Sequence, residues 1–126
     1  MSFPFEVGVD IVSVTRMREA IERQGKRFLD RIFTKDEQKY CETKRNKYEN
    51  YAARFAAKEA LIKAKGGGKG RFRFRDIEVK RGLHGKPYLS LTSAARKELG
   101  IKSNAEFLLT IAHEREFAVA TVMMSV

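Results

Sequence analysis

The clearest pattern in the chain is helical and covers residues 52–64, where small and apolar residues recur every three to four positions. Most of this segment consists of Ala, Leu, Lys, Glu and Arg, which favour helices, and the glycines at 66–68 follow it. We therefore predict a central helix that begins near residue 47 and ends before the glycines. At about 100° per residue, one stripe of this helix carries a carboxylate and an ammonium among small residues. Its members are Ala52, Phe55, Ala56, Glu59 and Lys63.

Apolar and β-branched residues predict strands on both sides of the central helix. Residues 5–12 form one candidate strand, in which Asp10 stands near the end and Gly8 lets another element approach the backbone. Residues 106–113 and 117–124 are both largely apolar and predict a long terminal hairpin. Apolar and polar residues alternate over 72–80, as in a strand. The alternation shifts by one residue at 75–76, which indicates a bulge or a late start of the strand. After a turn at 82–87, residues 88–91 complete a second hairpin.

Shorter helices are predicted between these strands. One begins at residue 13 or 15 and is ended or bent by Gly25. Thr34 and Glu37 form a capping box, which predicts a helix from there to about residue 44, and a short helix covers 93–99. The element order predicts an α+β fold with a mainly antiparallel sheet. The apolar sheet further suggests that another subunit covers part of its face or edge.

Composition limits the class of protein. A chain of 126 residues with 43% hydrophobic and 33% charged residues indicates one soluble globular domain, here residues 1–126. No segment approaches the ~20 apolar residues of a membrane span, and the first residues do not resemble a signal peptide. Cys41 is the single cysteine, which excludes an intrachain disulfide and favours a cytoplasmic location. The net charge of +10 implies an anionic partner: nucleic acid, an acidic protein or a phosphorylated cofactor.

Four residues on three predicted elements suggest chemistry. Asp10 ends the first strand, Glu59 and Lys63 lie one turn apart on the central helix, and His113 ends the penultimate strand. Two carboxylates from different elements suit Mg²⁺, which fills its remaining positions with water and phosphate oxygens. Lys63 and Arg54 could hold phosphate charge.

Three blocks of the sequence resemble a known enzyme family, the phosphopantetheinyl transferases. They are Gly8-Val9-Asp10-Ile11-Val12, Arg54-Phe55-Ala56-Ala57-Lys58-Glu59-Ala60 with Lys63, and Thr110-Ile111-Ala112-His113 followed by Phe117-Ala118-Val119-Ala120. The short single-domain chain is similar to the bacterial holo-[acyl-carrier-protein] synthase branch. The resemblance implies the 4′-phosphopantetheinyl transferase fold, with the sheet wrapped on the long central helix.

The resemblance also implies a reaction and a site. The reaction moves 4′-phosphopantetheine from coenzyme A to a serine of apo acyl carrier protein in fatty acid biosynthesis, and releases adenosine 3′,5′-bisphosphate. By this resemblance Asp10 and Glu59 bind Mg²⁺, and Lys63 contacts the phosphates. Glu59, acting through a metal-bound water, is the first candidate base and Asp10 the second. The implied coenzyme A ligands are Arg54, Lys63, His113, Gly85, Lys86 and Pro87, and the implied assembly is a homotrimer with active sites between subunits.

The basic first helix is predicted to receive the acidic carrier protein. In the family an arginine six residues after the strand aspartate makes such a contact, and Arg16 has that position. The chain departs from the family at Ala112, where Ser or Thr often precedes the histidine. The predicted docking residues are Arg16, Arg18, Arg23, Lys26, Arg27 and Phe28, with Met17 as a further apolar contact.

Two other functions fit part of the pattern. A small nucleic-acid-binding module would suit the positive charge and the alternation of Arg and Phe over 71–75, but it leaves the two carboxylates without a role. A structural trimer without activity leaves the pairing of Asp10 with Glu59 unexplained. Simpler structural roles also exist for single residues: a surface ion pair for Glu59 and Lys63, and a packed turn for His113.

Overall fold

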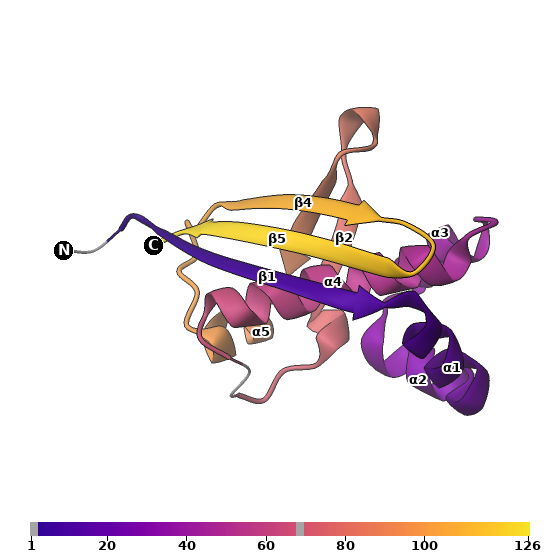
Figure 1. Ribbon diagram of the computed structural model, residues 1–126. Coiled ribbons are helices and arrows are strands. Elements are labelled where there is room, and N and C mark those ends of the chain that lie inside the picture. The colour runs from indigo at the N-terminus through magenta and orange to yellow at the C-terminus, as the bar shows by residue number, and fades with distance from the viewer. Residues whose placement is uncertain (1–2, 68–69) are drawn as a thin grey trace.

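The computed structural model describes residues 3–67 and 70–126 (Figure 1). Gly68, one of the glycines predicted to follow the central helix, lies outside the described residues. The order of the elements confirms an α+β fold with antiparallel strands. The elements are β1 Phe5–Ser13, α1 Val14–Gln24, α2 Lys26–Ile32, α3 Lys35–Glu42, α4 Lys47–Ala64, β2 Ile77–Arg81, β3 Pro87–Leu91, α5 Ser93–Leu99, β4 Phe107–His113 and β5 Phe117–Ser125, with short 3₁₀ turns η1 Phe74–Asp76 and η2 Leu83–Gly85.

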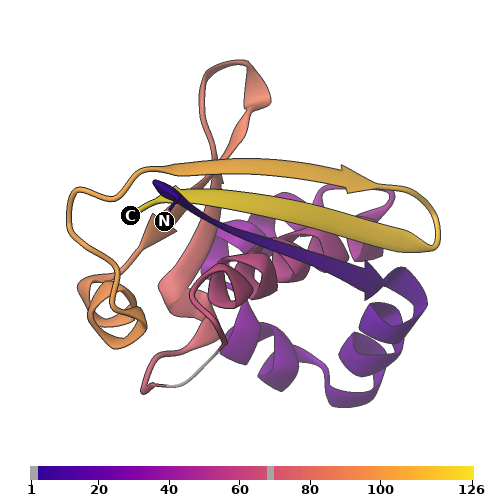
Figure 2. The same cartoon turned by 60° about the vertical axis from the view of Figure 1, so that its left-hand side comes forward.

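A three-stranded antiparallel sheet in the order β1-β5-β4 lies across the long helix α4 (Figures 1 and 2). The predicted terminal hairpin forms its β4 and β5 strands, and β1 pairs with the other edge of β5, so that Asp10 faces Ala120. Strands β2 and β3 form a separate hairpin that projects from the body. Apolar residues of α4 and the inner face of the sheet make the main core.

Gly8 brings β1 unusually close to α4. A Cβ atom at this position would lie 1.9 Å from the carbonyl oxygen of Ala60 and 2.6 Å from the backbone nitrogen of Ala64. Only glycine on the strand and small residues on the helix permit such contact. The close approach that the sequence predicted is therefore made by α4, and it brings Asp10 toward the turn of the helix that carries Glu59 and Lys63.

Two local predictions need correction. Asp10 does not end the first strand, because β1 continues to Ser13 through its pairing with β5. The strand predicted over 72–80 begins only at Ile77, which agrees with the late start that the slip indicated. Before it, the Asp76 carboxylate accepts a hydrogen bond from the backbone N–H of Arg73 at 2.9 Å, which favours the η1 turn over an extended strand. Helix α2 was not predicted, because its seven residues give too short a pattern.

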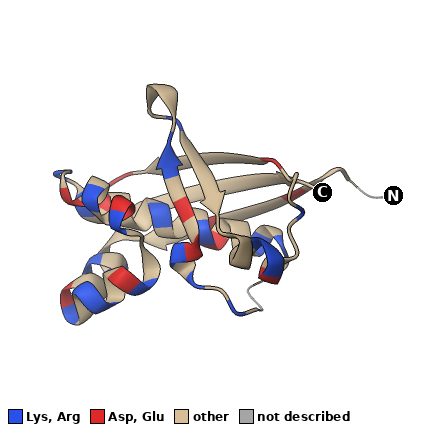
Figure 3. Cartoon of the chain, turned by 180° about the vertical axis from the view of Figure 1, so that it is seen from behind, with Lys and Arg blue, Asp and Glu red and all other residues tan. Residues whose placement is uncertain are grey.

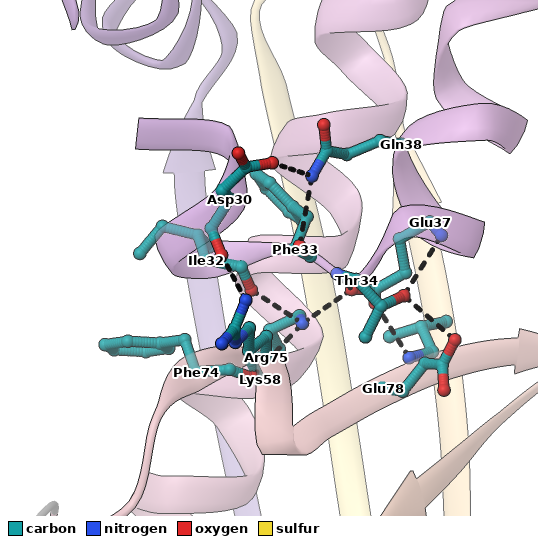
Figure 4. Close-up of polar contacts among 11 residues, drawn as sticks. Asp30, Ile32, Phe33, Thr34, Glu37, Gln38, Lys58, Phe74, Arg75 and Glu78 are labelled. Atoms are coloured by element: carbon teal, nitrogen blue, oxygen red, sulfur yellow. Dashed lines mark hydrogen bonds and ion pairs between the residues drawn. The ribbon is translucent and has the colours of Figure 1, made fainter. Parts of the chain in front are cut away.

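A buried ion pair joins the helices to the second hairpin (Figure 4). The Lys58 ammonium lies 2.7 Å from Glu37 Oε1 and also donates to the backbone carbonyls of Ile32 and Phe74, at 2.9 and 3.2 Å. Glu37 Oε2 accepts the backbone N–H of Val79 at 2.8 Å. The pair therefore connects α4 with α2, α3, η1 and β2. The predicted capping box at Thr34 and Glu37 is confirmed and belongs to the same cluster.

The outer face of the sheet is apolar and exposed. On β1 the residues that point away from α4 are Val7, Val9 and Ile11, which are 56%, 55% and 65% exposed. On β4, Leu108 is exposed on the same face, since it pairs with Met123, the partner of Val7. Such a continuous apolar surface is typical of a contact with another chain.

Candidate active site

Asp10 and Glu59 lie on the wall of one cleft of about 390 Å³, which we call the Asp10–Glu59 cleft. Asp10 comes from β1 and Glu59 from α4. Helix α1 contributes Arg16 and Met17 to the same cleft, and α2 contributes Phe28. The fold thus brings the two predicted metal ligands next to three of the residues predicted to contact the carrier protein.

Lys63 adds a positive charge beside Asp10. Its Nζ lies 2.6 Å from Asp10 Oδ1, and this hydrogen bond raises the pKa of Lys63. The Asp10 side chain is 11% exposed, whereas that of Lys63 is 54% exposed. The ammonium therefore stays accessible to an anionic ligand while it is held beside Asp10.

The pKa of Glu59 is raised, first by burial and then by the negative charge of Asp10, and Lys63 offsets only part of this. Two carboxylates that share a site repel each other, and a bound cation removes that repulsion. One or two carboxylates together with water and phosphate oxygens are the usual ligands of Mg²⁺, so this pair fits the ion. Within residues 3–67 and 70–126, no group of three or more His, Cys, Asp or Glu side chains gathers into a metal site.

The first two helices, which line part of the cleft, carry more Lys and Arg than Asp and Glu (Figure 3). Val14, Met17 and Ile21 turn into the core, which leaves the arginines of α1 on the solvent side. Met17 is therefore mainly a core residue, although it reaches the cleft, and Phe28 is half-buried. The exposed basic residues of these two helices are Arg16, Arg18, Arg23, Lys26, Arg27 and Arg31.

Arg54 lies in a different hollow, of about 320 Å³, between α3, α4 and the second hairpin. Its guanidinium stacks 4.2 Å from the ring centre of Tyr40, and Arg81 approaches the same ring at 4.8 Å. Among the described residues, the buried Nε of Arg54 has no hydrogen-bond partner. Sequence reasoning missed Tyr40, because no local pattern indicates that two arginines meet its ring.

The remaining predicted coenzyme A ligands also lie outside the Asp10–Glu59 cleft of the same chain. Lys86 and Pro87 line a hollow of about 280 Å³ between the second hairpin and β4. Gly85 ends the η2 turn, where its carbonyl accepts a hydrogen bond from Arg81. His113 ends β4, as predicted, and its Nδ1 lies 2.9 Å from Glu49 Oε1. One chain therefore brings together Asp10, Glu59 and Lys63, and holds the other predicted ligands elsewhere.

Two further observations bear on the alternatives. The arginines at 71–75 do not form an alternating strand: Phe74 lies in η1, and Arg73 pairs with Asp76 at 3.2 Å. Cys41 is buried, and burial raises the pKa of its thiol to about 12, which does not suit a nucleophile. None of the described helices combines the length and the apolar composition that crossing a bilayer requires.

Comparison with known proteins gives a consistent result. The sequence profile of the 4′-phosphopantetheinyl transferase superfamily matches residues 6–122. A holo-[acyl-carrier-protein] synthase of Halothermothrix orenii is 45% identical over 120 residues, which cover 93% of this chain and 94% of the relative.

Solved structures agree with this comparison. The Bacillus anthracis holo-(acyl-carrier-protein) synthase in complex with CoA (3′,5′-ADP) is 33% identical with a TM-score of 0.76, covering 95% of both chains. The Helicobacter pylori holo-[acyl-carrier-protein] synthase in complex with coenzyme A is 30% identical with a TM-score of 0.80, covering 94% of this chain and 99% of the other.

Proposed function

This chain belongs to the 4′-phosphopantetheinyl transferase superfamily, and we propose that its reaction takes place in the Asp10–Glu59 cleft. Like the holo-[acyl-carrier-protein] synthases that it resembles, it transfers 4′-phosphopantetheine from coenzyme A to a serine of apo acyl carrier protein. The other product is adenosine 3′,5′-bisphosphate. The observation that supports the location is the convergence of Asp10, Glu59 and Lys63 at a cleft bordered by a basic helix.

In the reaction the serine oxygen forms a bond to the β-phosphorus of coenzyme A, and the bond from that phosphorus to the oxygen that bridges the two phosphates breaks. Catalysis of such a transfer depends on positioning and on neutralising charge. The exposed ammonium of Lys63 would bind the phosphate oxygens and stabilise charge on the departing bisphosphate. Asp10 would keep that ammonium in place through its 2.6 Å hydrogen bond.

The serine proton needs an acceptor, and Glu59 is our first candidate. Its raised pKa makes it a stronger base than an ordinary glutamate. Asp10 is the second candidate. Asp10 and Glu59 would together hold Mg²⁺, which when bound supplies positive charge to the diphosphate.

We propose a homotrimer in which each active site lies between subunits. The outer face of the sheet, with Val7, Val9 and Ile11, is apolar and exposed. The apolar surface of a second copy would cover it. Assembly would also explain why Arg54, His113 and the loop at 85–87 lie outside the cleft of their own chain. They would contact coenzyme A bound at the Asp10–Glu59 cleft of a neighbouring copy.

The exposed basic residues of α1 and α2 would dock the carrier protein, which is acidic, with Phe28 as an apolar contact. We place the enzyme in the cytoplasm and in fatty acid biosynthesis. The single cysteine supports the location, because a chain without an intrachain disulfide does not depend on an oxidising compartment.

The deciding experiment measures the mass of apo acyl carrier protein after incubation with the enzyme, coenzyme A and Mg²⁺. We expect the carrier protein to gain the mass of one phosphopantetheine group. A chelator should prevent this gain, and Glu59→Gln should lower the rate of transfer by about 100-fold or more. Glu116→Gln removes the same charge from an exposed turn and should stay active. Full activity of Glu59→Gln, or activity that a chelator leaves unchanged, would contradict the proposed metal site. Absence of transfer together with tight RNA binding would favour the nucleic-acid module instead.

A further inference from the structure

Glu49 and His113 meet although 64 positions separate them in the sequence. Glu49 lies in the first turn of α4, and His113 is the last residue of β4. The distance from His113 Nδ1 to Glu49 Oε1 is 2.9 Å, and the two side chains are 29% and 20% exposed. The contact is therefore short, and part of the imidazole reaches solvent.

The chemistry of the pair fixes the tautomer of the histidine. An ionised carboxylate only accepts hydrogen bonds, so Nδ1 of His113 must carry a hydrogen and donate it to Glu49. In the neutral imidazole the other nitrogen, Nε2, is then an acceptor that points away from Glu49, and in the protonated ring it is a donor. The contact thus determines which nitrogen, and which edge of the ring, a ligand meets.

The Glu49 carboxylate is itself held in place by its own helix. Asn46 Nδ2 donates to Glu49 Oε1 at 3.3 Å. The buried Asn50 in turn donates from Nδ2 to Asn46 Oδ1 at 3.0 Å and to the Asn46 carbonyl at 3.1 Å. These bonds orient Asn46 and through it the carboxylate. The histidine therefore rests on a supported acceptor.

The hairpin end that carries His113 is anchored independently of this pair. The backbone N–H groups of Val14 and Glu114 donate to the carbonyls of Glu116 and Phe117, both at 2.9 Å. Glu114 Oε1 also accepts the N–H groups of Glu116 and Phe117. Since these bonds fix the backbone, the contact with Glu49 mainly decides the orientation of the imidazole.

We infer that Glu49 is a positioning residue, which holds the His113 ring so that Nε2 faces bound coenzyme A. The inference rests on the proposed function, in which His113 contacts that substrate. Its ligand is an anionic or hydroxyl oxygen of the nucleotide part, because an imidazole nitrogen recognises such groups by hydrogen bonding. Glu49 touches no substrate in this arrangement, and its effect passes entirely through His113.

Four variants test the inference: Glu49→Ala, Glu49→Gln, His113→Ala and the double variant Glu49→Ala/His113→Ala. We expect Glu49→Ala to raise the KM for coenzyme A about tenfold, as for the loss of one well-placed hydrogen bond, with little change in kcat. His113→Ala should have at least this effect, and the double variant should be no worse than His113→Ala. Glu49→Gln should recover most of the loss, because its amide oxygen still accepts from Nδ1. Glu116→Ala is the matched control for the loss of an exposed charge at the same end of the sheet.

The second readout is the tautomer of His113, measured by long-range ¹H–¹⁵N NMR. The wild-type ring should show hydrogen on Nδ1, and Glu49→Ala should shift it toward the Nε2-protonated form that free imidazoles favour. His84 is exposed and is the only other histidine, so it provides an internal reference. A merely structural role of Glu49 would change stability and the tautomer without raising the KM for coenzyme A.

The outcomes separate the two proposals. If His113→Ala leaves the KM for coenzyme A unchanged, the proposed role of His113 is wrong and the inference falls with it. If His113→Ala raises that KM but Glu49→Ala does not, or if the two effects add in the double variant, the inference alone is overturned. An unchanged tautomer in Glu49→Ala overturns it as well.

Discussion

The Lys58 ammonium and the Glu37 carboxylate form an ion pair at 2.7 Å, with both side chains fully buried. Lys58 directly precedes Glu59 on α4, and neighbouring residues of a helix point about 100° apart. Because Lys58 is fixed toward α2, α3 and η1, Glu59 is turned toward β1 and the cleft. The pair therefore sets the rotation of the helix that carries Glu59 and Lys63.

Replacing Lys58 by Met should be strongly destabilising. The variant leaves the Glu37 charge buried without its partner, and such a change costs about 3–5 kcal/mol. We expect a correspondingly lower midpoint in urea unfolding followed by circular dichroism. Adding Glu37→Gln to this variant should recover part of the loss, since the buried charge is then gone. A Lys58→Met protein as stable as the wild type would contradict the importance of the pair.

Gly8→Ala should disrupt the packing of β1 on α4. The added methyl group would lie 1.9 Å from the Ala60 carbonyl oxygen, so the strand and the helix must separate, at a cost of about 3 kcal/mol or more. Thermal unfolding measures the effect, and transfer activity should fall because Asp10 moves away from Glu59. Gly82→Ala is the control, because its Cβ would meet atoms only at 3.7 Å. Equal stability of the two variants would show that the close approach is unimportant.

The raised pKa of Glu59 predicts how stability depends on pH in the absence of metal. Between its ordinary pKa of 4.5 and the raised value, the folded protein binds a proton that the unfolded chain has already released. This contribution to stability is therefore present at low pH and is lost as the pH rises. Melting temperatures measured with a chelator should fall less steeply with pH in Glu59→Gln than in the wild type.

The same melting temperatures, measured with added Mg²⁺, test the proposed metal site. The ion should raise the melting temperature of the wild type near neutral pH, because it binds only the folded state, and should have little effect on Glu59→Gln. An equal rise in both proteins would place the ion elsewhere.

Arg16→Glu should lower the kcat/KM for the carrier protein. Arg16 is exposed at the edge of the Asp10–Glu59 cleft, and a negative charge there repels an acidic partner. We expect kcat/KM for the carrier protein to fall by about tenfold or more at low salt, with a smaller difference at high salt, while the KM for coenzyme A stays constant. Lys97→Glu makes the same charge change on α5 and should have little effect. Similar losses in both variants would point to net charge rather than docking.

Val9→Lys should break the proposed assembly. Val9 is 55% exposed on the outer face of the sheet, so a single chain tolerates a lysine there, whereas a subunit contact does not. Sedimentation should show a smaller species than the wild type, with lower activity if the sites lie between subunits. A control change, Lys97→Glu on the exposed side of α5, should leave the assembly intact. A wild-type protein that sediments as a monomer would refute the trimer directly.

The sequence predicted most of the elements because their signals are local. The composition of α4, the capping box at Thr34 and the apolar runs of the terminal hairpin each lie within one short segment. The resemblance of three blocks to a known family then singled out Asp10, Glu59 and Lys63 as candidate site residues. Helix α2 was missed because its seven residues give too short a periodic pattern. The start of β2 was predicted too early because the Asp76 carboxylate accepts the backbone N–H of Arg73, which favours a turn there.

By itself the sequence determined the α+β class, the family and the residues of the candidate site, since these depend on local propensity and on motifs along the chain. Only the tertiary structure decided which charges meet. Lys63 lies against Asp10, Lys58 against Glu37 and His113 against Glu49, each across a long stretch of sequence. Such pairings depend on how α4 packs against strands and helices from both ends of the chain, and no local pattern contains that information.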